Sequence, residues 1–127
     1  MPQKIILDVD TGTDDAVALM FAALDPRIEL VAATSVNGNQ DIDKTTENTL
    51  RALQHVGRSD IPVYRGCRFP MISTLTPGRK PNVPRTAASA VHGDWLPVEP
   101  ARKKEEAQHA VNFLIDYYMG PDGPDTI

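Results

Sequence analysis

The segment from Ile5 to Met20 constrains the fold of this chain more than any other, because it passes from an apolar run into a helical pattern within a few residues. The apolar run at its start is typical of a buried strand, and helical spacing follows Gly12. The apolar positions of that predicted helix are Val17, Met20, Phe21 and Leu24. A strand that leads directly into a helix favours an α/β fold with an open, mainly parallel sheet flanked by helices.

Four carboxylates, Asp8, Asp10, Asp14 and Asp15, lie in the same segment. The short turn is expected to gather them at the carboxyl end of the strand, where open α/β sheets bind ligands. Like charges held this close repel one another unless a cation, a proton or a hydrogen-bonding substrate offsets them. A hard divalent cation is the simplest partner for such a cluster.

A second strand is predicted over residues 28–36, a continuous apolar run of the kind found in strands covered on both faces. Pro26 separates this strand from the helix, because proline disfavours the α conformation in the residue before it. A right-handed crossover makes the two strands parallel and brings the loop at 37–40 to the end of the sheet where the aspartates lie. Asn39 is therefore a candidate to face the carboxylates.

A second helix and a third strand follow. Asp41 or Asp43 can cap the helix, and Gly57 supplies the usual C-terminal stop. The apolar positions on one face of this helix are Leu50, Leu53 and Val56. Residues 61–64 then predict a short strand.

Residues 65–100 differ from the rest of the chain. Prolines at 70, 77, 81, 84, 97 and 100 interrupt any period. A connection of this length is often a functional loop or a disordered segment. We interpret it as a proline-rich loop region inside one domain that spans residues 1–127.

The last helix is predicted from its apolar stripe and ends at Gly120. The stripe consists of Ala107, Ala110, Val111, Leu114, Ile115 and Tyr118. Thr126 and Ile127 have the character of the opening residues of another strand. We therefore expect a trimmed or incomplete domain, since no internal repeat restores the remainder.

Composition and charge exclude several kinds of partner and site. A net charge of -4 provides no basic surface for nucleic acid or an anionic membrane. No run approaches the roughly 18 apolar residues of a membrane span. Cys67 is the only cysteine, which excludes an internal disulfide and a zinc ribbon. These observations favour a soluble, cytoplasmic protein.

Two interpretations of the aspartates use only part of the motif. Thr11 or Thr13 suits a helix N-cap and each aspartate suits a turn or a first helical turn, but four together repel one another while a cap needs one side chain. The order Asp8-Val9-Asp10 after an apolar strand resembles the signature of haloacid-dehalogenase-like phosphatases, with Asp8 as nucleophile and Asp10 as acid/base. That similarity stops at Gly12, where the signature has Thr or Val.

The whole stretch from Leu7 to Ala16 resembles the DxDxGxDD signature of the inosine-uridine-preferring nucleoside hydrolase family. Later landmarks of the family have counterparts in the same order, at residues 33–39 (ATSVNGN), 63–66 (VYRG) and 91–93 (VHG). The aspartate motif is the specific part of this resemblance. Together the landmarks cover most of the chain.

The resemblance implies Ca²⁺-dependent hydrolysis of the N-glycosidic bond of ribonucleosides, giving ribose and free base, by a homo-oligomeric protein. It implies Ca²⁺ ligands at Asp10 and Asp15, with Asp10 also acting as the general base. Asp14 and Asn39 would contact the ribose, and Asp8 would support its neighbours. An Asp-rich turn suits Ca²⁺ on chemical grounds as well, because this ion takes about 6 to 8 oxygen ligands.

His92 is a further candidate substrate contact at the mouth of the site, with packing inside its own loop as the alternative, because Trp95 stands where the family has its next glycine. The family's remaining metal-binding and sugar-binding residues lie in the later portion of a chain more than twice this long. A catalytically inactive fragment or binding module of the same fold therefore remains open as a second function.

Overall fold

The computed structural model describes residues 1–38, 40–72 and 93–127. Two predicted site residues, Asn39 and His92, lie outside the described residues. In chain order the elements are β1 (Gln3–Val9), α1 (Thr13–Leu24), β2 (Ile28–Ser35), α2 (Ile42–His55), β3 (Val63–Arg65), α4 (Ala110–Tyr118) and the 3₁₀ turn η1 (Gly123–Asp125).

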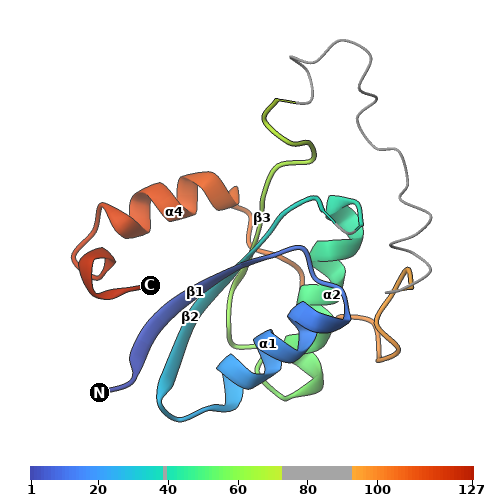
Figure 1. Ribbon diagram of the computed structural model, residues 1–127, viewed down its shortest axis with the longest axis horizontal. Coiled ribbons are helices and arrows are strands. Elements are labelled where there is room, and N and C mark those ends of the chain that lie inside the picture. Colours follow the sequence, from blue (N-terminus) through green and yellow to red (C-terminus); the bar gives the residue numbers. More distant parts are fainter. Residues whose placement is uncertain (39, 73–92) are drawn as a thin grey trace.

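The three strands form a parallel sheet in the order β1-β2-β3 (Figure 1). Val9 pairs with Ser35, and Ser35 pairs with Arg65. All three strands therefore end at the same level and open their carboxyl ends on one edge of the sheet. This confirms the predicted α/β architecture and the parallel pairing of the first two strands.

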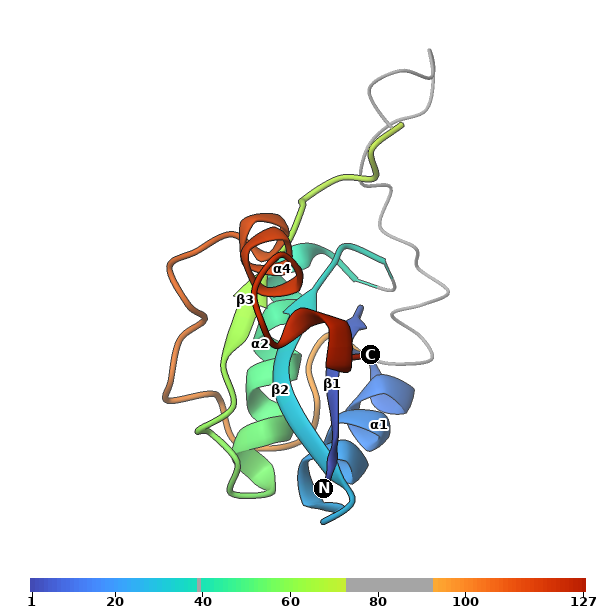
Figure 2. The same ribbon diagram turned by 90° about the vertical axis from the view of Figure 1, so that its left-hand side faces the viewer.

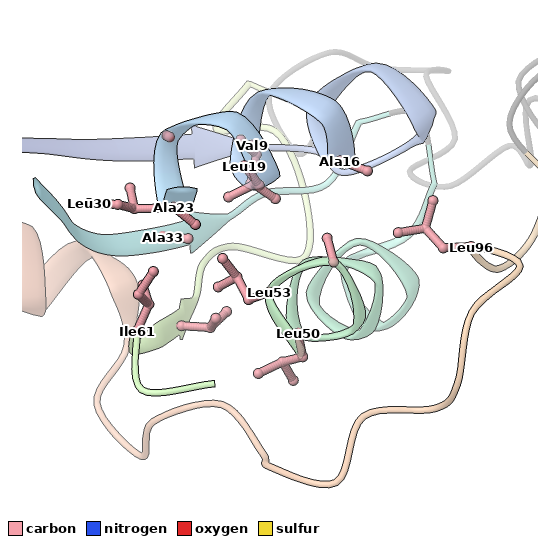
Figure 3. Packing of buried hydrophobic residues seen from close by; sticks show 13 residues of the cluster. Val9, Ala16, Leu19, Ala23, Leu30, Ala33, Leu50, Leu53, Ile61 and Leu96 are labelled. Atoms are coloured by element: carbon pink, nitrogen blue, oxygen red, sulfur yellow. The ribbon is translucent and has the colours of Figure 1, made fainter. Parts of the chain in front are cut away.

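The main core lies between one face of the sheet and helices α1 and α2 (Figure 3). Leu19 of α1, Leu53 of α2 and Val63 of β3 are almost completely buried there. Leu96 joins this core from outside the regular elements, at 5% exposure. The segment that carries Leu96 is thus held against the same helices that cover the sheet.

Helix α1 is confirmed, but the apolar positions that predicted it do not form its inner face. Val17, Phe21 and Leu24 are 59% to 66% exposed, and only Met20 among those positions is half-buried. The buried residues of α1 are Ala16, Leu19, Ala22 and Ala23. Three of these four are alanines, whose small side chains let a helix lie close to the sheet, so the larger apolar residues point outward.

Helix α4 covers the opposite face of the sheet, and Figure 1 shows the strands between α4 on one side and α1 and α2 on the other. Side chains alternate along a strand, so Tyr64 faces away from the core that buries Val63. Tyr64 stacks on Phe113 of α4, with ring centroids 3.8 Å apart and planes 6° from parallel. This pair is the main aromatic contact between α4 and the sheet.

Helix α4 also differs from its prediction. It begins at Ala110, because His109 caps it: Nδ1 of His109 accepts a 3.2 Å hydrogen bond from the backbone N–H of Val111. His109 is therefore an N-cap rather than a residue inside the helix. The buried residues are Ala110 and Phe113, whereas three members of the predicted stripe, Val111, Ile115 and Tyr118, are exposed.

Other boundaries agree with the sequence. Asp41 caps α2 by accepting a hydrogen bond from the N–H of Lys44, and Gly57 follows the helix with φ at +74°. Between β3 and α4, residues 66–72 and 93–109 contain no helix or strand. Among the described residues, no helix has both the length and the apolar character needed to cross a membrane.

The predicted strand opening at Thr126 is confirmed on the free edge of β1. Lys4 and Thr126 form a parallel bridge. The N–H of Ile6 donates to the carbonyl of Ile127, and the N–H of Ile127 donates to the carbonyl of Lys4. Figure 2 shows this end of the chain returning beside β1 after passing α4.

Candidate active site

The aspartate motif lies where the carboxyl ends of the strands meet. Val9 is buried beneath α1 and α2, so the preceding side chain, Asp8, faces the other side of the sheet. There the carboxylate of Asp8 accepts a 2.7 Å hydrogen bond from the hydroxyl of Thr34 on β2. Asp8 thus ties the end of β1 to β2, immediately before the turn.

Asp10 and Asp15 meet across that turn. The backbone N–H of Asp10 donates a 3.0 Å hydrogen bond to a carboxylate oxygen of Asp15. Burial raises the pKa of the Asp15 carboxyl, and the nearby side chains of Asp10 and Asp14 raise it further, while the Asp10 N–H opposes the change. The charge on Asp15 is therefore unfavourable in the metal-free protein, and either protonation or a nearby cation would relieve it.

Helix α1 begins directly after the turn, with Gly12 as its N-cap and no side-chain cap. The alternative prediction that Thr11 caps this helix is wrong, because the Thr11 hydroxyl lies 2.7 Å from the hydroxyl of Thr49 on α2. Asp14, exposed in the first turn, lies beside the positive end of the helix dipole together with Asp15.

The loop after β2 reaches Asp10, as the parallel pairing predicted. A Cβ atom added to Gly38 would lie 2.2 Å from the Oδ2 atom of Asp10, so only glycine fits at this approach. The N–H of Gly38 donates a 3.1 Å hydrogen bond to the carbonyl of Gln40. Gly38, which precedes Asn39, therefore lies against Asp10, and its backbone is bonded to Gln40 on the other side of Asn39.

The segment after His92 lies beside the same loop. The side-chain amide of Gln40 donates a 3.1 Å hydrogen bond to the carbonyl of Gly93. Lys44, in the first turn of α2, forms an ion pair of 2.6 Å with Asp94. Residues that flank both undescribed candidates, Asn39 and His92, are therefore connected to one another near the start of α2.

Sequence reasoning missed the polar side of α2. Its buried polar residues are Thr45, Thr46, Asn48 and Thr49, none more than 2% exposed. Two of them contact the end of β2: Thr45 donates to the carbonyl of Val36, and Thr46 contacts the Ser35 hydroxyl. Asn48 and Thr49 contact Thr11, in the turn after β1. Three threonines and an asparagine within five residues were the available signal, since buried positions on a helix are usually apolar.

The sequence and the structure of this chain are similar to those of known proteins. The sequence profile of the inosine-uridine preferring nucleoside hydrolases matches residues 5–127. The chain belongs to this nucleoside hydrolase family. The pyrimidine-specific ribonucleoside hydrolase RihB of Escherichia coli O157:H7 is 40% identical over 98% of this chain and 38% of its own length.

Solved nucleoside hydrolase structures share the fold. A purine-preferring ribonucleoside hydrolase from Gardnerella vaginalis superimposes with a TM-score of 0.82 at 28% identity, over 97% of this chain and 38% of that one. A plant nucleoside hydrolase gives a TM-score of 0.72 at 30% identity, over 94% of this chain and 36% of the other. The chain thus spans about two-fifths of the length of these relatives and matches part of a nucleoside hydrolase domain.

A Ca²⁺ ion fits the described residues in the kind of ligand they offer, since Asp10 and Asp15 supply hard carboxylate oxygens on one turn. Burial and the nearby side chains of Asp10 and Asp14 raise the pKa of Asp15, and a divalent cation would offset this effect by stabilising the charged carboxylate. Within residues 1–38, 40–72 and 93–127, no group of three or more His, Cys, Asp or Glu side chains is arranged to hold a metal. The described residues therefore offer two carboxylates of the kind that Ca²⁺ prefers, and fewer ligands than this ion takes.

Proposed function

We propose that the protein to which this sequence belongs hydrolyses the N-glycosidic bond of ribonucleosides in a Ca²⁺-dependent reaction, releasing ribose and a free base. The observation that carries the proposal is the contact between Asp10 and Asp15 at the carboxyl edge of the sheet, where the Asp10 N–H bonds the Asp15 carboxylate and the two side chains lie close together. Membership of the nucleoside hydrolase family supports it. Because the relatives are more than twice as long, the proposal concerns the whole protein.

In this proposal Asp10 and Asp15 hold the cation, and Asp10 removes a proton from the water that attacks the anomeric carbon. Bound Ca²⁺ would anchor ribose hydroxyls and lower the pKa of the attacking water. The transition state resembles an oxocarbenium ion, which nearby carboxylates stabilise. The Asp10 N–H holds the Asp15 carboxylate, and the Asp10 side chain lies near enough to raise the pKa of Asp15.

Asp14, Asn39 and His92 are proposed to contact the nucleoside. Asp14 is exposed beside the paired carboxylates, where it can accept hydrogen bonds from sugar hydroxyls. Asn39 follows Gly38, whose backbone lies against Asp10. His92 precedes Gly93, which is bonded to Gln40 of the same loop.

Asp8 is proposed to support this site without touching the substrate. Its hydrogen bond to Thr34 fixes the last residues of β1 relative to β2. That role differs from the phosphatase interpretation, in which Asp8 is the nucleophile. A carboxylate engaged with a neighbouring strand suits support better than nucleophilic attack.

Ribose release from inosine, uridine and a nitrophenyl riboside, with added Ca²⁺ and with a chelator, tests the proposal. We expect release that requires Ca²⁺. Binding of Ca²⁺ or nucleoside without turnover would instead identify an inactive binding module. Hydrolysis of nitrophenyl phosphate with Mg²⁺ would favour the haloacid-dehalogenase-like alternative.

We further propose that the protein is a homo-oligomer, as the family resemblance implies, and that it acts in the cytoplasm, as its composition favours. Three apolar side chains of α1 are exposed and could contact another protein subunit: Val17, Phe21 and Leu24. Sedimentation of the whole protein and fractionation of the producing cells test the two points. A monomer, or a protein outside the cytoplasm, would contradict them.

A further inference from the structure

Asn48 is the one described residue of α2 whose side chain connects the aspartate turn to the segment 93–102. Its Nδ2 donates a 3.2 Å hydrogen bond to the carbonyl of Thr11, and its Oδ1 accepts a 3.0 Å hydrogen bond from the N–H of Leu96. The residue is 2% exposed. Only a side chain with both a donor and an acceptor satisfies these two backbone groups.

The neighbouring hydroxyls hold the same turn from a second direction. Thr49 donates its proton to the carbonyl of Thr45 at 2.8 Å, so in the 2.7 Å contact between Thr11 and Thr49 the Thr11 hydroxyl is the donor. Both the backbone and the side chain of Thr11 are therefore bound to α2. Thr11 is completely buried and directly follows Asp10.

The segment 93–102 lies along α2 and is bound at intervals of about one helical turn. Gln40 and Lys44 hold its start, as described above. Arg51 lies 5.0 Å from the ring centroid of Trp95, and Gln54 bonds the carbonyl of Pro100 and the N–H of Arg102. Asn48 occupies the middle of this row, where Leu96 enters the core.

We propose that Asn48 is a positioning residue for the aspartate turn, fixing Asp10 and Asp15 for cation binding through Thr11 and coupling them to the segment 93–102. The link to cation binding rests on the proposed function. The link to the turn itself rests only on the contacts of Asn48, so the two can be tested separately.

The test compares Asn48→Ala with Thr46→Val in the whole protein. Thr46 is equally buried on the same helix and contacts Ser35, not the aspartate turn. Asn48→Asp serves as a second variant, because it keeps the side-chain volume and the acceptor for Leu96 and removes the donor to Thr11. Hydrogen exchange of the Asp10 amide, without metal, is measured against that of Ala33, whose N–H is bonded to Pro62 inside the fold.

We expect exchange at Asp10 to rise at least about tenfold relative to Ala33 in both Asn48 variants and to stay unchanged in Thr46→Val. The dissociation constant for Ca²⁺ should rise about 10- to 100-fold in Asn48→Ala, the usual effect of removing a partner behind the metal ligands. If hydrogen exchange in the Asn48 variants rises equally at Asp10 and Ala33, or does not rise at either, Asn48 is not a positioning residue for the turn. If the unmodified protein binds no Ca²⁺, the proposed function fails while the exchange ratio still decides the role of Asn48.

Discussion

The backbone N–H of Asp10 donates a 3.0 Å hydrogen bond to the carboxylate of Asp15, the residue whose pKa is raised by burial and by its acidic neighbours. A raised pKa in the folded state means that ionised Asp15 weakens the metal-free fold. This destabilisation of the folded protein is absent when Asp15 is protonated, and it grows as the pH rises through the pKa that Asp15 has in the folded state.

Asp15→Asn should therefore raise the melting temperature of the metal-free protein at neutral pH, because asparagine keeps an acceptor for the Asp10 N–H and removes the charge. The same variant should weaken Ca²⁺ binding at least about tenfold, since a charged ligand is lost. Thermal unfolding with a chelator and calorimetric titration with Ca²⁺ measure the two effects. If the variant binds Ca²⁺ as tightly as the unmodified protein, Asp15 is not a Ca²⁺ ligand.

Gly38→Ala tests the close approach of the second loop to Asp10. The added methyl group would lie 2.2 Å from the Asp10 carboxylate, so either the loop or Asp10 must move. We expect ribose release to fall at least about tenfold, as small misplacements at reacting groups commonly cost more than that.

Gly57→Ala is the matched control for this loop change. Gly57 has φ at +74° with nothing within 4 Å of an added Cβ, so alanine there should cost about 1 to 2 kcal/mol of stability and leave the rate unaffected. Equal rates in the Gly38 variant and the unmodified protein would show that this approach does not matter for the site.

Leu19→Ala and Phe21→Ala test which face of α1 is inside. Leu19 is fully buried and should lose about 2 to 5 kcal/mol of unfolding free energy on truncation. Phe21 is 59% exposed, so its truncation should change the unfolding free energy by only about 0.5 kcal/mol. Urea denaturation measures both, and a loss at Phe21 as large as at Leu19 would show that this outer face is covered in the whole protein.

The Asp25 carboxylate contributes to folding stability with a pH dependence opposite in sign to that of Asp15, and Asp25→Asn tests this. Arg27 bonds the Asp25 carboxylate through its side chain and backbone and lowers its pKa to about 2, from an ordinary 3.8. The stabilisation is complete above pH 3.8 and is lost as the pH falls toward 2. The variant should therefore be less stable at pH 7, with a difference that narrows below pH 4 in thermal unfolding curves. A difference independent of pH would contradict the ion pair.

The sequence predicted the sheet well because its strands and crossovers follow strong rules. The apolar run before Asp8 and the break at Pro26 suffice to place the first two strands parallel with their carboxyl ends together, and the run at 61–64 predicts a third strand, which the structure has at Val63–Arg65. It also predicted the proximity of the loop at 37–40 to the aspartates, since parallel strands end on the same edge.

The sequence predicted the apolar face of α2, where Leu50 and Leu53 are buried and Val56 packs against the core, but it did not predict which side chains face inward on α1 and α4. On α1 the sequence pattern drew attention to the large apolar residues Phe21 and Leu24. The helix instead packs closely on the sheet through a face that consists mostly of alanines. On α2 a row of threonines beside Asn48 resembles a solvated face, and its burial depends on hydrogen bonds to Thr11 and other strand-end groups far away in the chain. Such partners are set by tertiary contacts, which local periodicity does not encode.

The rate of ribose release by Asp10→Asn, compared with the unmodified protein at saturating Ca²⁺ and nucleoside, tests the central claim most directly. Loss of a general base usually lowers the rate of the chemical step about 10²- to 10⁴-fold. We predict a fall in this range with the melting temperature nearly unchanged. An undiminished rate would contradict the assignment of Asp10 as the residue that activates water.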